Sequence, residues 1–90
     1  MHAVLHSVSI HDRAVAEAEL ETLVPQISGA QDFAGGYWIE GPVDTGVAVL
    51  MFDSEQGAKG FAEMLRGAPD SPGVTLDRNS IHVGQVIKHA

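Results

Sequence analysis

Histidine is the residue type in this chain best able to do chemistry, since there are five histidines and no cysteine. The absence of cysteine excludes disulfides, thiolate nucleophiles and thiolate zinc sites. His6 stands out because it lies in an alternating segment, residues 3–10, on the same face as Val4, Val8 and Ile10. An imidazole titrates near neutral pH, so His6 could act as a general base on an acidic phenol or enol.

Gln85 is the expected partner of His6. If the final strand pairs antiparallel with the first so that Val4 faces Ile87, apolar residues face one another and His6 faces Gln85. Gln85 would then orient the imidazole as a second catalytic residue. A slip in this register would place His6 opposite Gly84 or His82 instead. The alternative is a structural role, in which His6 is buried and a glutamine satisfies its hydrogen bond.

The other histidines do not predict a metal site. Zinc needs three or four ligands that converge on one ion. His2 and His6 share a face but stand about 13 Å apart along a strand, and His2 and His89 lie near the termini. We therefore expect no metal site within the chain.

Four aromatic residues are candidates to line a substrate-binding pocket. Tyr37 and Trp38 are neighbours in a predicted strand, residues 35–40, so they point to opposite faces of the sheet. Phe52 ends the next strand, and Phe61 lies in the helix that follows it. Packing in a core or an interface is the alternative role for these side chains.

Length and charge limit the possible functions. A chain of 90 residues has room for one core, so we expect a single domain spanning 1–90. The net charge of -7 argues against nucleic acid and anionic membranes as partners. The start of the chain lacks the pattern of a signal peptide, and no segment has the roughly 20 apolar residues that span a bilayer. A cytoplasmic location is the expectation.

Hydrophobic periodicity and turn residues predict six elements. Pro25 lies inside the first helical pattern, where it removes one hydrogen bond, so this helix should kink or end near Val24. Gly57 and Gly60 in the second helix predict close approach to another backbone. The expected elements are a strand at 3–10, a helix from Asp12, strands at 35–40 and 45–52, a helix from Asp53 or Ser54 to Gly67, a loop at 68–78 with an extended piece at 74–76, and a strand at 80–88.

The order strand, helix, strand, strand, helix, strand predicts an α+β, ferredoxin-like βαββαβ fold. Right-handed crossovers place the first and third strands in the centre of a four-stranded antiparallel sheet, with both helices on one face. The third strand is apolar on both faces, and the helices can cover only one. Val47, Val49 and Met51 would therefore lie bare in a monomer, which predicts a homodimer packed sheet to sheet.

These features resemble a known superfamily. The run Phe33-Ala-Gly-Gly-Tyr-Trp, the strand ending Met51-Phe52-Asp53-Ser54-Glu55 and the alanine at position 58 are similar to the dimeric α/β-barrel superfamily, within it the small antibiotic-biosynthesis-monooxygenase-like domains. The resemblance covers nearly the whole chain and implies a dimeric α/β barrel. It specifies activity weakly, because the same barrel serves quinol oxygenation, haem degradation, lactone isomerisation and ligand sensing.

The polar residues of the characterised oxygenases in this family are missing here. Those enzymes share an asparagine in the sheet and a tryptophan at the end of the third strand, and the haem enzymes add a histidine on the second helix. By this resemblance the tryptophan position falls on Phe52 and the asparagine position on Ala48, while residues 54–66 contain no histidine. We therefore expect no haem. Gly35-Gly36 also lacks the spacing of a dinucleotide-binding turn, so no cofactor is expected.

Two functions remain open. The first is a cofactor-independent monooxygenase or isomerase that acts on a small aromatic or polyketide-like molecule, with His6 as its base. The second is a non-catalytic module that binds a small hydrophobic ligand or another protein. A closed cavity lined by His6 and Gln85 would favour catalysis, whereas a filled core would leave only association.

Overall fold

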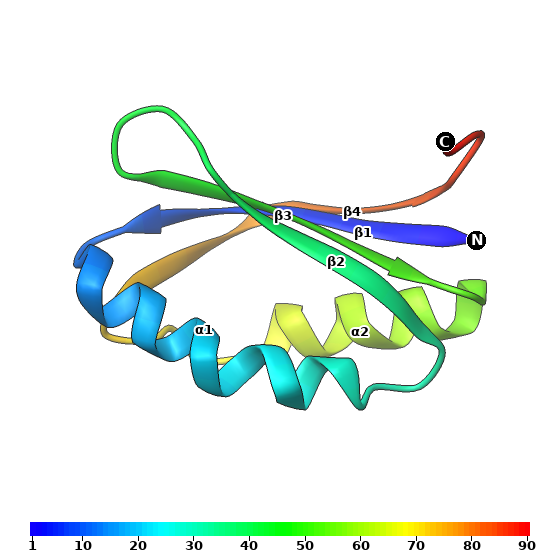
Figure 1. Cartoon of the computed structure of the whole chain (residues 1–90), viewed down its shortest axis with the longest axis horizontal. Helices are drawn as coiled ribbons and strands as arrows, with labels where there is room; N and C mark the ends of the chain where they lie inside the picture. The colour runs from blue at the N-terminus through cyan, green and yellow to red at the C-terminus, as the bar shows by residue number, and fades with distance from the viewer.

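The computed structural model describes residues 1–90. Its strands and helices follow one another in the order β-α-β-β-α-β (Figure 1). No helix is both long and apolar enough to cross a membrane. The elements are β1 (His2–Ile10), α1 (Arg13–Ser28), β2 (Phe33–Glu40), β3 (Thr45–Phe52), α2 (Glu55–Gly67) and β4 (Val74–Gln85).

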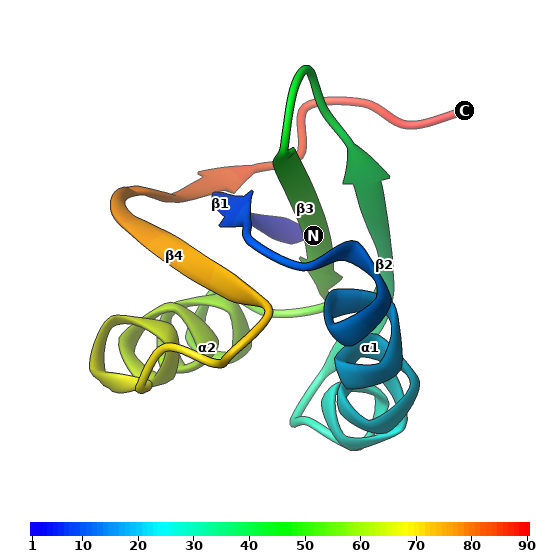
Figure 2. The same cartoon turned by 90° about the vertical axis from the view of Figure 1, so that its left-hand side faces the viewer.

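The four strands form one antiparallel sheet in the order β2-β3-β1-β4, which confirms the predicted central positions of β1 and β3. Both helices lie on the same side of this sheet (Figure 1). Viewed along the helices, α1 lies beneath β2 and α2 lies beside β4 (Figure 2). The fold is therefore ferredoxin-like, with one covered face, called the helix face below, and one outer face without any element on it.

The core lies between the helix face and α2. Leu50 and Phe52 of β3 and Val4 of β1 are fully buried there. The Phe52 ring packs against Phe61 of α2, with ring centroids 5.4 Å apart, and edge-on against Phe33 at 5.7 Å. Two alanines of α2, Ala58 and Ala62, complete the core, because small side chains let the helix approach the sheet closely.

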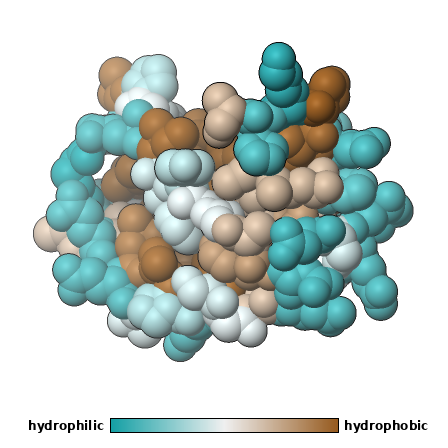
Figure 3. Space-filling view, turned by 45° about the vertical axis from the view of Figure 1, so that its right-hand side comes forward, coloured by the Kyte–Doolittle hydropathy of each residue, from teal (hydrophilic) through white to brown (hydrophobic).

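The outer face carries the alternate residues of the same strands and is apolar too. Val47 is exposed, while Val49 and Met51 are half-buried. Tyr37 pairs with Val49, and Ile39 pairs with Val47; these two side chains are 62% and 52% exposed. In a side view, which shows the sheet edge-on, hydrophobic residues reach the surface in the middle of the molecule, between hydrophilic ones (Figure 3). The predicted second apolar face of β3 is confirmed.

Both helices begin at a side-chain cap. Asp12 accepts a hydrogen bond from the N–H of Val15, and Ser54 accepts one from the N–H of Gly57, so each satisfies a donor that the first turn leaves free. The expected helix end near Val24 is wrong, because α1 continues through Pro25 to Ser28. A kink at Pro25, the other outcome expected there, stays a prediction.

The last strand differs most from the prediction. β4 is one strand from Val74 to Gln85, whereas the sequence predicted a loop with a short extended piece and a separate strand ending at Lys88. A register shift interrupts its pairing with β1 between Leu5 and Ser7. At this bulge the N–H of Ser7 donates to the hydroxyl of Ser80 at 2.8 Å. The bulge breaks the alternation of side chains between the two faces of the sheet. The sequence pattern therefore predicted two separate segments where the structure has one strand.

Candidate functional site

The structure separates the two residues that were expected to form a catalytic pair. Gln85 pairs with His2, and Leu5 pairs with His82, while beyond the bulge Ser7 pairs with Asp77. Gln85 therefore lies four residues along the sheet from His6, about 13 Å at the rise of a strand. The predicted register is wrong on both sides of the bulge: β4 ends at Gln85, so Val4 pairs with Val83 and not with Ile87. Gln85 does not orient His6.

His6 lies on the helix face, on the same side of the sheet as Val4, as their spacing predicted. It pairs with Ala48 on β3, and Ala48 pairs with Trp38 on β2, so these three residues form one row across the sheet. The imidazole is half-buried, and its Nδ1 is buried without a hydrogen-bond partner. Burial lowers the pKa of His6 below its usual value. The ring is therefore neutral at pH 7 and keeps one nitrogen unpaired.

Tyr37 and Trp38 point to opposite faces, as expected for neighbours in a strand. Trp38 packs against the core on the helix face. Tyr37 is 62% exposed on the outer face, opposite Val49. Neither side chain lines the pocket described next, so their assignment to substrate binding stays a prediction.

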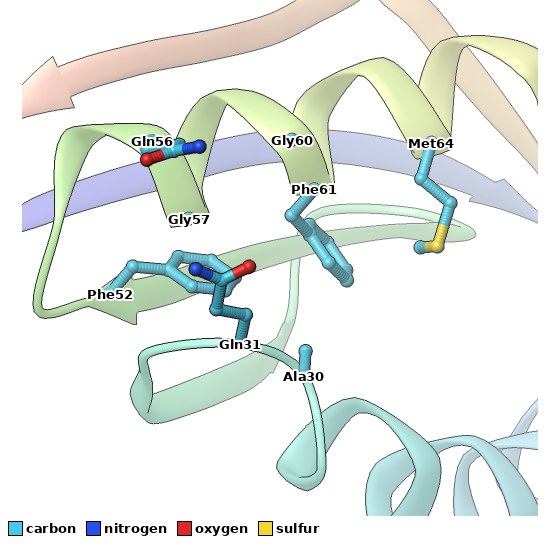
Figure 4. Close-up of a pocket in the computed structure, with 8 residues that line it drawn as sticks. All are labelled: Ala30, Gln31, Phe52, Gln56, Gly57, Gly60, Phe61 and Met64. Carbon is cyan, nitrogen blue, oxygen red and sulfur yellow. The ribbon is translucent and has the colours of Figure 1, made fainter.

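The other two aromatic candidates, Phe52 and Phe61, do meet at a pocket. It has a volume of about 230 Å³, is open to solvent, and lies between α2 and the loop that joins α1 to β2. Gln31 extends over the Phe52 ring, while Phe61 and Met64 extend from α2 toward the same space (Figure 4). The lining residues are Ala30, Gln31, Phe52, Gln56, Gly57, Gly60, Phe61 and Met64.

Hydrogen bonds between α2 and the α1–β2 loop hold the wall of this pocket in place. The N–H of Asp53 donates to the Asp32 carbonyl at 2.8 Å, and the Ser54 hydroxyl donates to the Asp32 carboxylate at 2.6 Å. Asp32 has a left-handed backbone, with φ of 60°, which turns the chain toward α2. The loop is thus anchored to the first turn of α2.

Gly57 and Gly60 of α2 serve different purposes. A Cβ at Gly57 would lie 2.9 Å from the Gln31 carbonyl oxygen, so the predicted close approach is confirmed there. A Cβ at Gly60 would meet nothing within 4 Å, so the same prediction is wrong for Gly60. Gly60 instead leaves the pocket open along the helix.

The pocket can bind but offers no group for proton transfer. Its only polar side chains are the amides of Gln31 and Gln56, and none of its lining residues is titratable. No group of three or more histidine, cysteine, aspartate or glutamate residues is placed to hold a metal ion. Sequence reasoning missed Gln31, Gln56 and Met64. Met64 could have been found from its helical spacing after Phe61, whereas nothing in the pattern places a loop residue such as Gln31.

Comparison with known proteins gives a likeness in structure alone. No family model matches the sequence, and no curated protein matches it. A similar solved structure is that of the haem-degrader MhuD from Mycobacterium tuberculosis, with two haems bound in its active site. The likeness has a TM-score of 0.53 and covers 97% of this chain and 98% of that one, at 17% sequence identity.

The pocket beside α2 does not fit a haem. α2 contains no histidine that could ligate an iron. The pocket of about 230 Å³ is also smaller than the roughly 300–1,000 Å³ of sites that hold drug-sized ligands. Nothing in the pocket therefore supports binding of a porphyrin.

The likeness in fold extends over nearly the entire length of both chains. It agrees with the observed topology, in which two helices cover one face of a four-stranded antiparallel sheet. This chain therefore has the ferredoxin-like βαββαβ fold, which it shares with that haem-degrader.

Proposed function

We propose that this protein is a non-catalytic binding module for a small, flat, uncharged ligand, which it holds in the pocket beside α2. One observation carries the proposal: the pocket combines two aromatic walls and two amide side chains with no titratable group. Phe52 and Phe61 offer π faces to a planar molecule. Gln31 and Gln56 can each donate and accept a hydrogen bond at its polar edge.

Size and charge narrow the class of ligand. A dry cavity of about 150 Å³ accepts benzene, so a pocket of about 230 Å³ suits a molecule of one or two rings. The net charge of -7 disfavours anions over the whole surface. A neutral quinone, phenol or heteroaromatic compound meets both conditions.

The same proposal includes a homodimer. The outer face of the sheet exposes apolar side chains from β2 and β3, among them Tyr37, Ile39 and Val47. Contiguous apolar patches of this kind are typical of interaction surfaces. Two sheets packed face to face across a twofold axis would bury these residues from both copies. The partner copy then closes the barrel, while the pocket beside α2 stays open.

The pocket can be tested by filling it. In a titration with menadione, an uncharged two-ring quinone, we expect NMR shifts confined to the amides of Gln31, Gln56 and Gly60. Gly60→Leu should abolish them, because its side chain would occupy the pocket. Gly60→Ala is the matched control: its Cβ meets nothing within 4 Å, so the shifts should remain.

Two results would contradict the pocket proposal. One is the absence of any shift up to millimolar menadione. The other is an unchanged titration in folded Gly60→Leu, which would place the ligand elsewhere. 1-Naphthoate, an anion of similar shape, should bind at least tenfold more weakly than menadione.

A second function remains supported by His6. Its neutral imidazole, with Nδ1 unpaired on the helix face, could accept a proton from a phenol, as a cofactor-independent monooxygenase or isomerase requires. Oxygen uptake with a small hydroquinone would test this. If the protein is such an enzyme, His6→Ala should lower turnover by about 10² or more, the usual contribution of a general base. Equal turnover in both proteins would leave only the binding function.

A further inference from the structure

The turn that carries Gln31 into the pocket beside α2 has a defined backbone. The N–H of Phe33 donates to the Ala30 carbonyl at 3.2 Å, which makes Gln31 the second residue of a four-residue β-turn. Asp32, the third residue, has a φ of 60°, as the third residue of a type II turn does. The turn therefore sets the point from which the Gln31 side chain extends.

Three contacts hold this turn against α2. The Asp32 carbonyl accepts from the N–H of Asp53 at 2.8 Å, and the Asp32 carboxylate accepts from the Ser54 hydroxyl at 2.6 Å. A Cβ at Gly57 would lie 2.9 Å from the Gln31 carbonyl oxygen, so glycine lets this peptide pack directly on the helix. Position 31 is thus fixed relative to α2 by contacts on both sides of its peptide bond.

The Gln31 side chain offers a specific pattern of hydrogen bonds. Its amide extends over the Phe52 ring and presents an N–H donor and a C=O acceptor side by side (Figure 4). Such an amide forms two parallel hydrogen bonds with an edge that carries an acceptor and a donor on adjacent atoms, as glutamine does with adenine. A quinone offers only acceptors, so it can form one of the two. No titratable group lines the pocket, so no charge there competes with this pattern.

We propose that Gln31 determines the specificity of the pocket by selecting flat ligands with a cis-amide edge, and that the contact between Asp32 and Ser54 positions it. This inference rests on the binding function proposed above and narrows the ligand to heteroaromatic lactams, in which an N–H and a C=O are adjacent in one ring. The lactam edge meets the Gln31 amide. The rings of the ligand lie against Phe61 and Met64, which extend toward the same space (Figure 4).

Two isomers of one bicyclic lactam test the role of Gln31. 4-Methyl-2-quinolone keeps the N–H beside its carbonyl, whereas 1-methyl-2-quinolone has a methyl group in place of that hydrogen. In NMR titrations of the wild-type protein, the 4-methyl isomer should bind about tenfold more tightly, the order expected for one hydrogen bond. Gln31→Met has a similar length but no amide, so it should bring the two affinities within about twofold. Gln26→Met, the matched change on exposed α1, should keep the tenfold ratio.

Ser54→Asp tests the positioning of Gln31. Aspartate can still cap α2, but it cannot donate to Asp32 and repels its carboxylate. The ratio of affinities for the two isomers should fall below about threefold, while affinity for the 1-methyl isomer stays within about twofold, because that isomer lacks the second hydrogen bond to Gln31. Ser54→Thr keeps the hydroxyl and should keep the wild-type ratio. A purely structural role of Ser54 would instead lower both affinities together.

The outcomes separate this inference from the binding function on which it rests. If neither menadione nor either quinolone binds the wild-type protein, both proposals are wrong. If all three bind and the two isomers bind equally, the pocket binds ligands but the specificity proposed for Gln31 is overturned. An unchanged ratio in folded Gln31→Met would also overturn it. An unchanged ratio in folded Ser54→Asp would overturn the positioning role of the contact with Asp32.

Discussion

The two faces of β3 differ in whether the helices of the same chain cover them. Ala48, Leu50 and Phe52 point to the helix face and are buried. Val47, Val49 and Met51 alternate with them along the same strand, and each stays exposed or half-buried. Both sets are equally apolar, so composition does not explain the difference. Two helices are available to cover one face, and nothing in the chain covers the other.

This contrast assigns separate roles to the two faces. Side chains on the helix face hold the domain together, so changes there should unfold it. Side chains on the outer face are proposed to join two copies, so changes there should alter assembly. The helix face is incomplete at the pocket beside α2 and at the unpaired Nδ1 atoms of His2 and His6. The predictions below separate these roles, from the largest expected effect to the smallest.

Leu50→Ala should have the largest effect, because Leu50 is fully buried in the centre of the core. Large-to-small core changes of this type lower the free energy of unfolding by about 2–5 kcal/mol. In a domain of this size, that is much of the total stability. Chemical denaturation would measure it. A loss below about 1 kcal/mol would mean that the helix face is poorly packed.

Val49→Asp tests the outer face at the neighbouring position. A carboxylate in a desolvated sheet-to-sheet interface has no partner, so the homodimer should dissociate or unfold. Sedimentation at micromolar concentration would follow the mass. Ile87→Asp is the control, since Ile87 is 98% exposed outside the sheet and should leave the dimer intact. A wild-type protein that sediments as a folded 9.5 kDa monomer would refute the dimer directly.

A similar contrast exists within α2, between Gly57, which lies against the α1–β2 loop, and Gly60, which faces open space. Gly60→Ala should raise the free energy of unfolding by about 1 kcal/mol, the difference in helix propensity, because its Cβ enters open space. Gly57→Ala should lower it, because its Cβ would lie 2.9 Å from the Gln31 carbonyl. Thermal unfolding of both variants would measure this. Equal shifts of the same sign would show that the α1–β2 loop is not anchored to α2.

The fold could be predicted from the sequence because its signals are local. Alternation, turn residues and the doubly apolar β3 were enough to give the order of elements and the central strands. The site was harder to predict because it depends on register. At the bulge beside His6, the N–H of Ser7 donates to the hydroxyl of Ser80 in place of a backbone carbonyl. No sequence pattern predicts this substitution of a side chain for a backbone partner. Gln31 enters the pocket from a loop whose position depends on Asp32 and Ser54.

His6 should give the smallest effect, and one that depends on pH. Burial lowers its pKa in the folded protein, so below pH 6.5 the unfolded chain binds the proton more readily than the folded one. His6 therefore destabilises the fold as pH falls from 6.5 toward its lowered pKa, and contributes no such penalty above that window. His6→Val removes the titrating group from an apolar row.

The measurement is the thermal midpoint of wild type and His6→Val across pH 5 to 8. As pH falls below 6.5, the thermal midpoint of His6→Val should rise further above that of wild type, so the gap between them widens. The control is His89→Val in the exposed tail, whose midpoint should follow that of wild type. A constant gap would mean that His6 is solvated in solution and is not a shielded base. If the gap widens and menadione binds both proteins equally, His6 is a tolerated residue of the helix face and the ligand pocket is separate from it.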